Sequence, residues 1–396
     1  MKGSEEKKTE TKIDGAQNQG PAESIDAPST GDSPALTKAA SGQSQGATTE
    51  FKSFLKAPTA AKEVITGNVR VFCRFRPLNA RELSTTENEV CVTFKDDKTC
   101  SVMGINSKTG NQEPIDYTFD ATFDPNKRQR DLYDSAVCPV IDSVLEGFNG
   151  TILAYGQTGS GKTHTMLGPD IDDEEEKGII PRMVGGIFAK IESAAEEIEF
   201  TVKVSMIEIY NEKIRDLLDP KKNNLRIHEN KEQGIYVKDM TESYVGGEDE
   251  VFSLLKIGNE NRSIGSTDMN KQSSRSHSVF ILQIEQKNTV DFSSKTGKIY
   301  LVDLAGSERI AKTGAQGQTL DEAKNINKSL TCLGQVINAL TDGKSTHIPY
   351  RDSKLTRILQ ESLGGNSRTS LIVTCSPSVF NEHETVSTLR FGQRAK

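Results

Sequence analysis

A glycine-rich octapeptide constrains the fold of this chain more than any other stretch. It reads Gly156-Gln-Thr-Gly-Ser-Gly-Lys162-Thr163. Glycines let the backbone turn so that successive N–H groups face anionic oxygens, while Lys162 can reach outer phosphates and the Thr163 hydroxyl can hold Mg²⁺. The pattern predicts a loop that wraps phosphate groups, formed by Gly156, Gln157, Thr158, Gly159, Ser160, Gly161, Lys162 and Thr163.

The sequence on both sides of the octapeptide supports this prediction. The apolar run 151–155 is typical of a buried strand, and residues 164–167 can continue a helix. The alternative is a glycine-rich surface turn with a chance lysine, which both flanks disfavour. Strand, loop and helix come in the order that phosphate binding requires.

Composition bounds the class of protein. The chain has 396 residues, 34% of them hydrophobic and 27% charged, which is enough for one large domain with a sizeable core. The net charge of −7 argues against a generally basic nucleic-acid-binding protein, although it leaves room for a local basic patch. Because no apolar stretch reaches the ~20 residues of a membrane helix and no signal-peptide core begins the chain, we expect a soluble intracellular protein. Six cysteines without metal-binding or C-x-x-C spacing are expected to be free thiols in a reducing cytosol: Cys73, Cys91, Cys100, Cys138, Cys332 and Cys375.

Residues 1–66 differ in composition from the rest of the chain. They are rich in Lys, Glu, Ser, Thr, Gly, Gln, Ala and Pro, with almost no large apolar residue before Phe51. Such a segment cannot bury enough surface to offset the entropy lost on ordering, so we predict a disordered N-terminal extension. Its acidic residues argue against a mitochondrial presequence. An ordered domain is predicted for residues 67–396.

Hydrophobic periodicity predicts an α/β fold within the ordered part. Besides 151–155, strands are expected at 68–75, 90–94, 117–119, 200–210, 279–284, 298–303 and 371–375. Helices are expected at 131–148, through 216–218 up to Pro220, at 319–340 with a capping box of Thr319 and Glu322, and from Ser353 to Gly364-Gly365. Several strands are continuously apolar, which indicates a central mixed, mostly parallel β-sheet flanked by helices on both faces.

Hydrolysis needs more than phosphate binding, and two further segments supply candidates. Asp303 ends an apolar strand, where a carboxylate can hold the water shell of Mg²⁺, and Gly306 could donate its N–H to a terminal phosphate. The alternative role for Asp303 is to cap the following helix. The second segment, 270–277, carries Asn270 as a further nucleotide-binding candidate and the hydroxyls of Ser273 and Ser274, which could reach Mg²⁺ or phosphate. Its Arg275 could neutralise charge or pair with Glu308, although by itself the segment could equally be a solvated loop.

The identity of the nucleotide can be inferred from a missing residue. A Ras-like guanine site needs Asn-Lys-x-Asp, whereas the matching stretch here is Asn327-Lys-Ser-Leu330 within a predicted helix. The sequence therefore favours ATP over GTP.

Taken together, these motifs resemble a kinesin motor domain, a P-loop NTPase, from about Gly67 to Lys396. The resemblance rests on Arg74-Phe-Arg-Pro77, 154–164, 270–277, Asp303-Leu-Ala-Gly-Ser-Glu308, 325–330 and 347–357. Residues 359–365 and 391–396 are most similar to the conventional branch, which has an N-terminal motor. In that family the motor is followed by a neck linker and a coiled coil, so dimerisation is expected only with such a C-terminal segment.

The resemblance also implies roles for individual residues. Segment 270–277 corresponds to switch I and segment 303–308 to switch II. Arg275 and Glu308 would form a salt bridge that helps to order the lytic water, and Ser274 would join Thr163 at Mg²⁺. The residues implied to border the adenosine are Arg74, Pro77 and His164.

A basic region follows switch II in the sequence. Residues 309–357 contain eight basic and four acidic side chains, a local charge of +4. Taken alone, these charges could belong to an ordinary solvated helical face. The family resemblance implies a tubulin interface instead, formed by Lys312, Lys324, Lys328, Arg351, Lys354 and Arg357, with Lys231 and Lys238 as further candidates.

The leading hypothesis is an ATP-driven motor head that moves along microtubules in the cytoplasm. Within the family, the alternatives are a kinesin that regulates microtubule dynamics or one that moves to the minus end. From other classes, the alternatives are a non-motile microtubule-binding module and a nucleic-acid-dependent P-loop ATPase; the absence of tryptophan and of an aromatic-basic stripe gives the last little support.

Overall fold

The computed structural model describes a single folded unit that begins near the first predicted strand. The described residues are 69–84, 89–105, 111–231, 234–264, 274–308, 318–342, 344–365 and 367–396, with the backbone alone at 105, 264 and 318–327. The predicted extension 1–66 lies outside this part of the chain. No helix among the described residues is long and apolar enough to cross a lipid bilayer.

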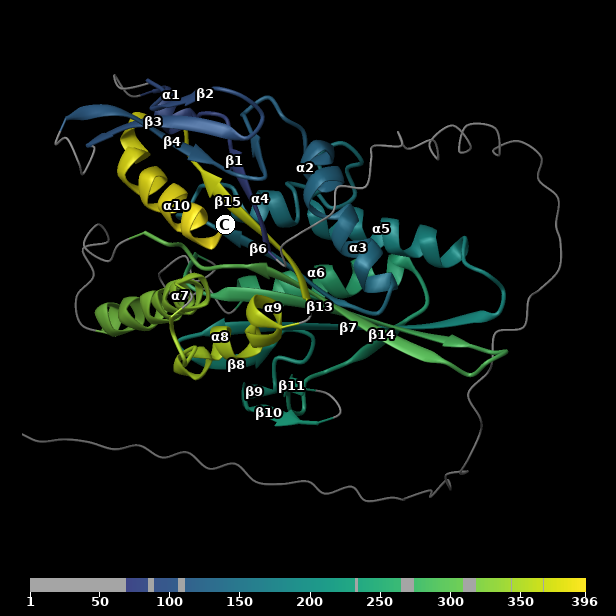
Figure 1. Ribbon diagram of the computed structural model, residues 1–396. Coiled ribbons are helices and arrows are strands. Elements are labelled where there is room, and N and C mark those ends of the chain that lie inside the picture. Colours follow the sequence, from purple (N-terminus) through teal and green to yellow (C-terminus); the bar gives the residue numbers. More distant parts are fainter. Residues whose placement is uncertain are drawn as a thin grey trace, which may run out of the picture. The chain divides into compact units, whose positions relative to one another are not determined.

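A ten-stranded sheet forms the centre of the fold (Figure 1). Its order is β5 (Ala121–Phe123), β1 (Val69–Phe75), β15 (Ser367–Cys375), β6 (Asn149–Tyr155), β14 (Ser294–Asp303), β13 (His277–Asn288), β7 (Ile198–Tyr210), β8 (Lys213–Asp216) and β9 (Asn223–Leu225), and β12 (Ser243–Val245) pairs with β7. Pairing is parallel from β5 to β14 and antiparallel from β14 to β9. The predicted mixed sheet is therefore confirmed.

Helices cover both faces of this sheet, as predicted (Figure 1). One face packs against α2 (Gln129–Ala136), α3 (Cys138–Leu145), α4 (Lys162–Met166), α5 (Ile179–Glu192) and α6 (Glu248–Ile264). The other packs against α7 (Gln318–Thr341), α8 (Lys354–Ile358), α9 (Gln360–Gly364) and α10 (Glu382–Ala395).

The central strands explain why both faces need covering. In β14, Ile299 and Leu301 belong to the core on the α2–α6 side, whereas Tyr300 and Val302 belong to the core on the α7–α10 side. Successive side chains of a strand point to opposite faces, so a strand buried on both faces reads as a continuous apolar run.

Smaller elements complete the described part of the chain. They are the short helices α1 (Ala80–Leu83), η4 (Tyr350–Asp352) and η5 (Val379–Asn381), the three-stranded sheet of β2 (Val92–Phe94), β3 (Thr99–Ile105) and β4 (Gln112–Thr118), and the hairpin of β10 (Ile227–Asn230) and β11 (Gly234–Val237).

The helix predicted through 216–218 is wrong. Asn211 and Glu212 adopt positive φ angles of 51° and 57°, so the chain reverses tightly after β7 and returns as strand β8. The Asp216 carboxylate then accepts the N–H groups of Leu218 and Asp219 at 2.9 and 3.1 Å. This local hydrogen bonding is an alternative to the helix that the Leu-Leu pair suggested.

Two other predicted helices are each divided into two. The stretch 131–148 forms α2 and α3, which separate at Val137, and Pro139 lies in the first turn of α3, where its missing N–H is tolerated. The helix that follows Ser353 divides at Leu359 into α8 and α9. By contrast, α7 confirms the helix at 319–340, although its predicted capping box lies among side chains that are not described.

The stack of Phe391 on Tyr155 ties α10 to the strand that leads into the glycine-rich loop. Their ring centroids lie 3.8 Å apart with planes inclined by 10°. We expect Phe391→Ala to lower the free energy of unfolding by about 3–5 kcal/mol, measured by urea denaturation, because it leaves a cavity in the core.

Phe380→Ala is the matched control for that substitution. Phe380 is 54% exposed, so its truncation should cost less than about 1 kcal/mol. Equal losses in the two variants would contradict this account of the core.

Candidate phosphate-binding site and its switch loops

The site lies where several strands end at one edge of the sheet. The parallel strands β1, β15, β6 and β14 all end there, and the antiparallel strand β13 begins there. In open α/β sheets this carboxyl edge is the usual place for a ligand. The glycine-rich loop follows β6, Asp303 ends β14, and His277 begins β13.

The loop connects β6 to α4 as the sequence predicts. Gly159 and Gly161 have φ angles of 76° and 100°, in the left-handed region that favours glycine, and Gly161 is the N-cap of α4. At Gly156, a Cβ atom would collide with the Thr374 carbonyl oxygen and the Ser160 side chain. The glycine spacing is therefore a steric requirement of this loop.

Lys162 folds back over the loop that carries it. Its Nζ donates hydrogen bonds to the Gly156 and Gln157 carbonyl oxygens, both at 2.9 Å. Burial lowers the pKa of this lysine, and the neighbouring Asp303 and Glu308 carboxylates oppose that shift. A buried ammonium held only by carbonyl oxygens is well placed to bind an anion that enters the loop.

Asp303 connects Thr163 to a residue that the sequence analysis missed. Its Oδ2 accepts the Thr163 hydroxyl at 2.8 Å and the Arg262 guanidinium at 3.0 Å. Arg262 comes from α6 and also donates to the Ser276 carbonyl oxygen at 3.2 Å. This buried ion pair thus joins the metal-binding candidates to the segment that carries Ser274.

The chemistry of these residues fits a magnesium ion. The other carboxylate oxygen of Asp303, Oδ1, is buried without a hydrogen-bond partner among the described residues. Hydroxyl and carboxylate oxygens are the ligands that Mg²⁺ prefers, usually one or two of them together with substrate phosphates. Within the described chain, no group of three or more His, Cys, Asp or Glu side chains could hold a metal ion.

Backbone hydrogen bonds attach the segment after β14 to its neighbours. Gly306 N–H donates to the Ser274 carbonyl oxygen at 2.8 Å, and Ser307 N–H donates to the Gly156 carbonyl oxygen at 3.1 Å. The structure therefore brings together Gly306, Ser274 and the glycine-rich loop. Asn270 and Ser273 lie outside the described residues.

Glu308 is placed against the glycine-rich loop. Its carboxylate accepts the Thr158 N–H at 2.8 Å and the Thr158 hydroxyl at 2.5 Å. A Cβ atom on Gly306 would collide with the Glu308 carboxylate and the Thr158 hydroxyl unless these side chains moved, so glycine at this position leaves room for their contact. Arg275, the residue after Ser274, is half-buried, and its pairing with Glu308 stays a prediction.

His277 is a buried part of the same site. Its side chain is 2% exposed, its Nδ1 accepts the Ala305 N–H at 3.0 Å, and its Nε2 lies 2.7 Å from the Ser329 hydroxyl of α7. Burial, and then the nearby Arg262 charge, lower the pKa of His277 to about 3. The ring is therefore neutral at physiological pH.

The residues expected to border adenosine are joined by a glutamine that the sequence analysis missed. The buried Gln129 amide accepts the Arg74 guanidinium at 2.7 Å and donates to the His164 carbonyl oxygen at 2.9 Å. Burial lowers the pKa of Arg74 to about 10 and also lowers that of His164. Pro77 is exposed at the end of the same segment as Arg74.

A buried carboxylate, Glu82, anchors the other side of the loop. It accepts hydrogen bonds from both terminal nitrogens of Arg76, the Asn79 N–H, the Ser376 hydroxyl and the Asn381 amide, at 2.6–2.9 Å. Arg76 Nε in turn donates to the Gly159 carbonyl oxygen at 2.6 Å, and the Gln157 amide donates to Asn381 at 2.8 Å. Burial would raise the pKa of Glu82, but these hydrogen bonds and the Arg76 charge lower it to about 2.

Short motifs do not reveal Arg262 or Gln129, and for Glu82 the sequence shows only a capping box with Asn79. Arg262, Gln129 and Glu82 act through partners 41, 35 and 294 positions away in the chain. Only the folded sheet brings such pairs together.

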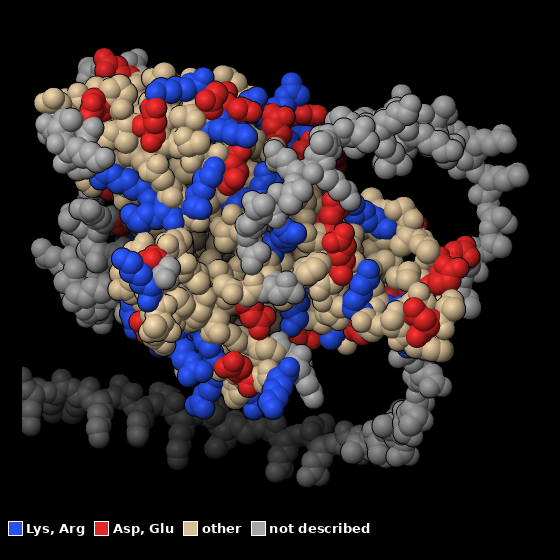
Figure 2. All heavy atoms as spheres, in the orientation of Figure 1, with Lys and Arg blue, Asp and Glu red and all other residues tan. Residues whose placement is uncertain are grey.

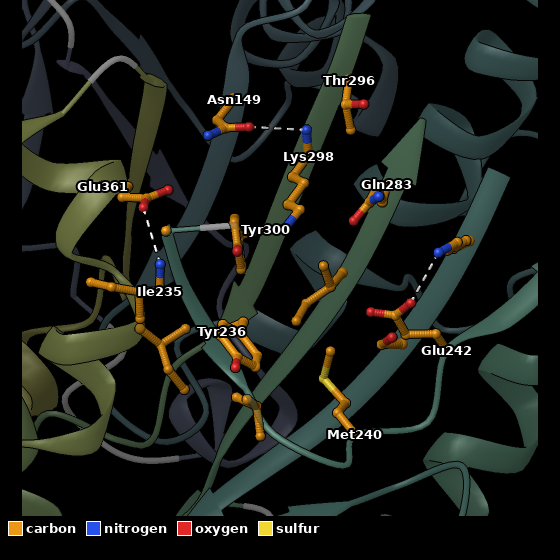
Figure 3. Close-up of a pocket in the computed structure, with 16 residues that line it drawn as sticks. Asn149, Ile235, Tyr236, Met240, Glu242, Gln283, Thr296, Lys298, Tyr300 and Glu361 are labelled. Carbon is orange, nitrogen blue, oxygen red and sulfur yellow. Dashed lines mark hydrogen bonds and ion pairs between the residues drawn. The ribbon is translucent and has the colours of Figure 1, made fainter. Parts of the chain in front are cut away.

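A hollow of about 520 Å³ lies elsewhere, on the α7–α10 side of the sheet beside β11 (Figure 3). Two of the polar side chains that line it are engaged by backbone groups: Glu361 accepts the Ile235 N–H at 3.2 Å, and Asn149 accepts the Lys298 N–H at 3.1 Å. None of the site residues predicted from the sequence lines it. The phosphate-binding candidates are thus separate from this hollow.

The fold and the loop define a P-loop nucleotide-binding domain, and comparisons with known proteins identify its family. Residues 74–396 match the kinesin motor domain. The chain is 56% identical over 329 residues to a kinesin heavy chain of Syncephalastrum racemosum, with 83% of this chain and 34% of that one covered. It is 52% identical to kinesin heavy chain isoform 5C of Homo sapiens, with 83% and 33% covered. A solved structure of a fast kinesin superposes with a TM-score of 0.78 at 54% identity, covering 83% of this chain and 91% of that chain.

The chain therefore belongs to the kinesin family, and the resemblance to conventional kinesin heavy chains is confirmed. It spans about a third of the length of the heavy chains that it matches. Kinesin motor domains bind nucleotide and microtubules.

The Glu82 network should make stability depend on pH. A carboxylate whose pKa is about 2 in the folded chain and about 4.3 in the unfolded chain stabilises the fold above pH 4.3, and that contribution is lost as the pH falls towards 2. We expect Glu82→Gln to lower the free energy of unfolding by about 2–3 kcal/mol at pH 6, and by about half as much at pH 3. Urea denaturation at both pH values measures the difference.

The exposed Glu89 supplies the control. Glu89→Gln should change stability by less than about 0.5 kcal/mol at either pH. A Glu82→Gln deficit that is the same at pH 6 and pH 3 would contradict the role of the ionised carboxylate.

Proposed function

We propose that this chain is an ATP-hydrolysing motor head whose turnover is stimulated by microtubules. The observation that carries the proposal is the direct hydrogen bonding of the segment after Asp303 to both Ser274 and the glycine-rich loop. A terminal phosphate that entered between the glycine-rich loop and this segment would have to replace these hydrogen bonds. The relatives named kinesin heavy chain support the same function, as does the fast kinesin studied for its ATPase mechanism and microtubule interactions.

The glycine-rich loop binds the phosphates in this proposal. Backbone N–H groups from Gly156 to Thr163 and the N-terminus of α4 face the anion, and Lys162 exchanges its two carbonyl partners for phosphate oxygens. Mg²⁺, when bound, neutralises charge on the transferred phosphoryl group. Thr163 and Ser274 would hold that ion directly, and Asp303 would hold it through water.

The nucleotide base lies towards α2 in this proposal. Arg74, Pro77 and His164 border the adenosine, and Gln129 fixes two of them through its amide. Asn270 and Ser273 are proposed to contact the phosphates from the preceding segment.

Glu308 and Arg275 sense the γ-phosphate. Glu308 holds Thr158 in the structure, and we propose that nucleotide binding transfers its carboxylate to Arg275, where the pair helps to orient the attacking water. Gly306 N–H would exchange the Ser274 carbonyl for a phosphate oxygen. Hydrolysis and loss of the γ-phosphate then remove the group that held Gly306, Glu308 and Arg275 in these contacts. The segment thus acts as a phosphate-dependent switch.

The microtubule interface is proposed on the α7–α8 side. Arg351 and Arg357 both pair with Glu229 of β10, so the β10–β11 hairpin and α8 form one continuous surface. Figure 2 shows Lys and Arg side chains gathered over this region. The proposed contacts are Lys328, Arg351, Lys354 and Arg357, with Lys231 and Lys238 beside the hairpin; Lys312 and the Lys324 side chain lie outside the described residues.

The deciding experiment measures steady-state ATP turnover with and without microtubules, with single-stranded DNA as the control polymer. We expect at least a tenfold increase with microtubules and none with DNA, and the microtubule concentration for half-maximal rate should rise with added salt. Glu308→Ala should abolish the stimulated rate.

Each part of the proposal can fail separately in this assay. Stimulation by DNA alone, or by neither polymer, would contradict the motor function. A Glu308→Ala variant with the wild-type stimulated rate would contradict the switch while leaving the function standing.

A further inference from the structure

A histidine ring bridges the phosphate-sensing segment and α7. His277 begins β13 directly after the segment that carries Ser274, and its ring lies between Ala305 and Ser329. The ring is 2% exposed and Ser329 is also 2% exposed, so water does not compete for these hydrogen bonds. This contact joins the site to α7 independently of the chain that runs from Gly306 to the helix.

The hydrogen-bond pattern fixes the direction of the bridge. A neutral imidazole carries one N–H group, and the nitrogen without it is an acceptor. Because the Ala305 N–H donates to Nδ1, the proton lies on Nε2, which must donate to the Ser329 hydroxyl at 2.7 Å. The ring stays in this tautomer as long as both neighbours keep their positions.

Each end of the bridge is next to a functional residue. Ala305 precedes Gly306, whose N–H is proposed to follow the γ-phosphate. Ser329 follows Lys328, which is exposed on α7 and is a proposed microtubule contact. A displacement of the segment around Ala305 therefore reaches the microtubule-facing helix through a single side chain.

We propose that the His277–Ser329 hydrogen bond is a positioning contact that couples the phosphate-sensing segment to α7. This inference rests on the proposed function and assigns one element of its regulation. His277 orients Ser329 and contacts no reacting atom. Loss of the hydrogen bond weakens the communication between microtubule and nucleotide without removing a residue from the phosphate site.

Ser329→Ala tests this role because it removes the acceptor and leaves the histidine in place. We expect basal ATP turnover within about twofold of wild type, and stimulation by microtubules reduced about fivefold, which is the lower end of measured coupling between sites. Ser329→Cys replaces the hydroxyl group with a larger thiol that accepts hydrogen bonds weakly, so its stimulation should lie between those of wild type and Ser329→Ala.

Ser362→Ala is the matched control variant. Ser362 of α9 is 3% exposed and accepts a hydrogen bond from the Thr151 hydroxyl at 2.6 Å. The alanine variant therefore loses a similar buried hydrogen bond at a place away from the switch segment. Its stimulation should equal that of wild type even if its unfolding temperature falls. A drop in both variants alike would show a general effect of destabilisation and would overturn the proposal.

The remaining outcomes are also decisive. Full stimulation in Ser329→Ala, with wild type stimulated normally, would overturn the coupling role and leave the proposed function intact. Absence of stimulation in wild type would overturn the function itself. If circular dichroism shows Ser329→Ala to be unfolded, Ser329→Cys is judged by the same two rates, and full stimulation in that variant would overturn the proposal.

Discussion

Three consecutive backbone N–H groups hold the candidate phosphate-binding site together. Ala305 donates to the His277 ring, Gly306 to the Ser274 carbonyl, and Ser307 to the Gly156 carbonyl. They can do so because β14, β13 and β6 are neighbours in the sheet. The carboxyl ends of β14 and β6 and the start of β13 meet at one edge. A segment bonded to three separate elements cannot move without changing all three contacts, and a phosphate that competes for one of them affects the others.

The two sides of the site differ in how firmly they are held. On one side, the glycine-rich loop is anchored by the Glu82 network and by the Ser160–Thr374 hydroxyl contact of 2.7 Å. On the other, Gly306 and Ser307 each donate one backbone hydrogen bond, and the Glu308 carboxylate accepts two from Thr158. Buried networks whose members are all satisfied rigidify a structure, whereas single hydrogen bonds can be exchanged for a ligand at little net cost. A fixed loop facing an exchangeable segment is the arrangement that a phosphate-dependent switch needs.

Much of this arrangement could be predicted from the sequence because local patterns carry it. The glycine spacing of the loop, the apolar runs of β6, β13 and β14, and the long amphipathic α7 are all set by neighbouring residues. Asp303 could be placed at the metal-binding candidates because it ends a buried strand. The missing guanine motif favoured ATP, and family resemblance then gave the partner, which periodicity alone could not.

The rest depends on tertiary contacts or on local competition. Arg262 and Gln129 could not be found because their partners are distant in the chain. Glu82 is visible in the sequence only as the capping-box partner of Asn79, and its contacts with Ser376 and Asn381 require the fold. The wrong helix at 216–218 arose because an Asp side chain can satisfy the backbone as well as a helix does. His277 was seen only as part of a polar segment, because its bridging role requires the helix that packs against it.

The central claim is that nucleotide at the glycine-rich loop changes the affinity of the α7–α8 side for microtubules. Co-sedimentation of the chain with microtubules, in a non-hydrolysable ATP analogue and in ADP, tests it most directly. The account predicts that the dissociation constant differs at least fivefold between the two states, with the tighter binding in the analogue. Equal dissociation constants would contradict it, because a ligand that binds both conformations equally shifts neither.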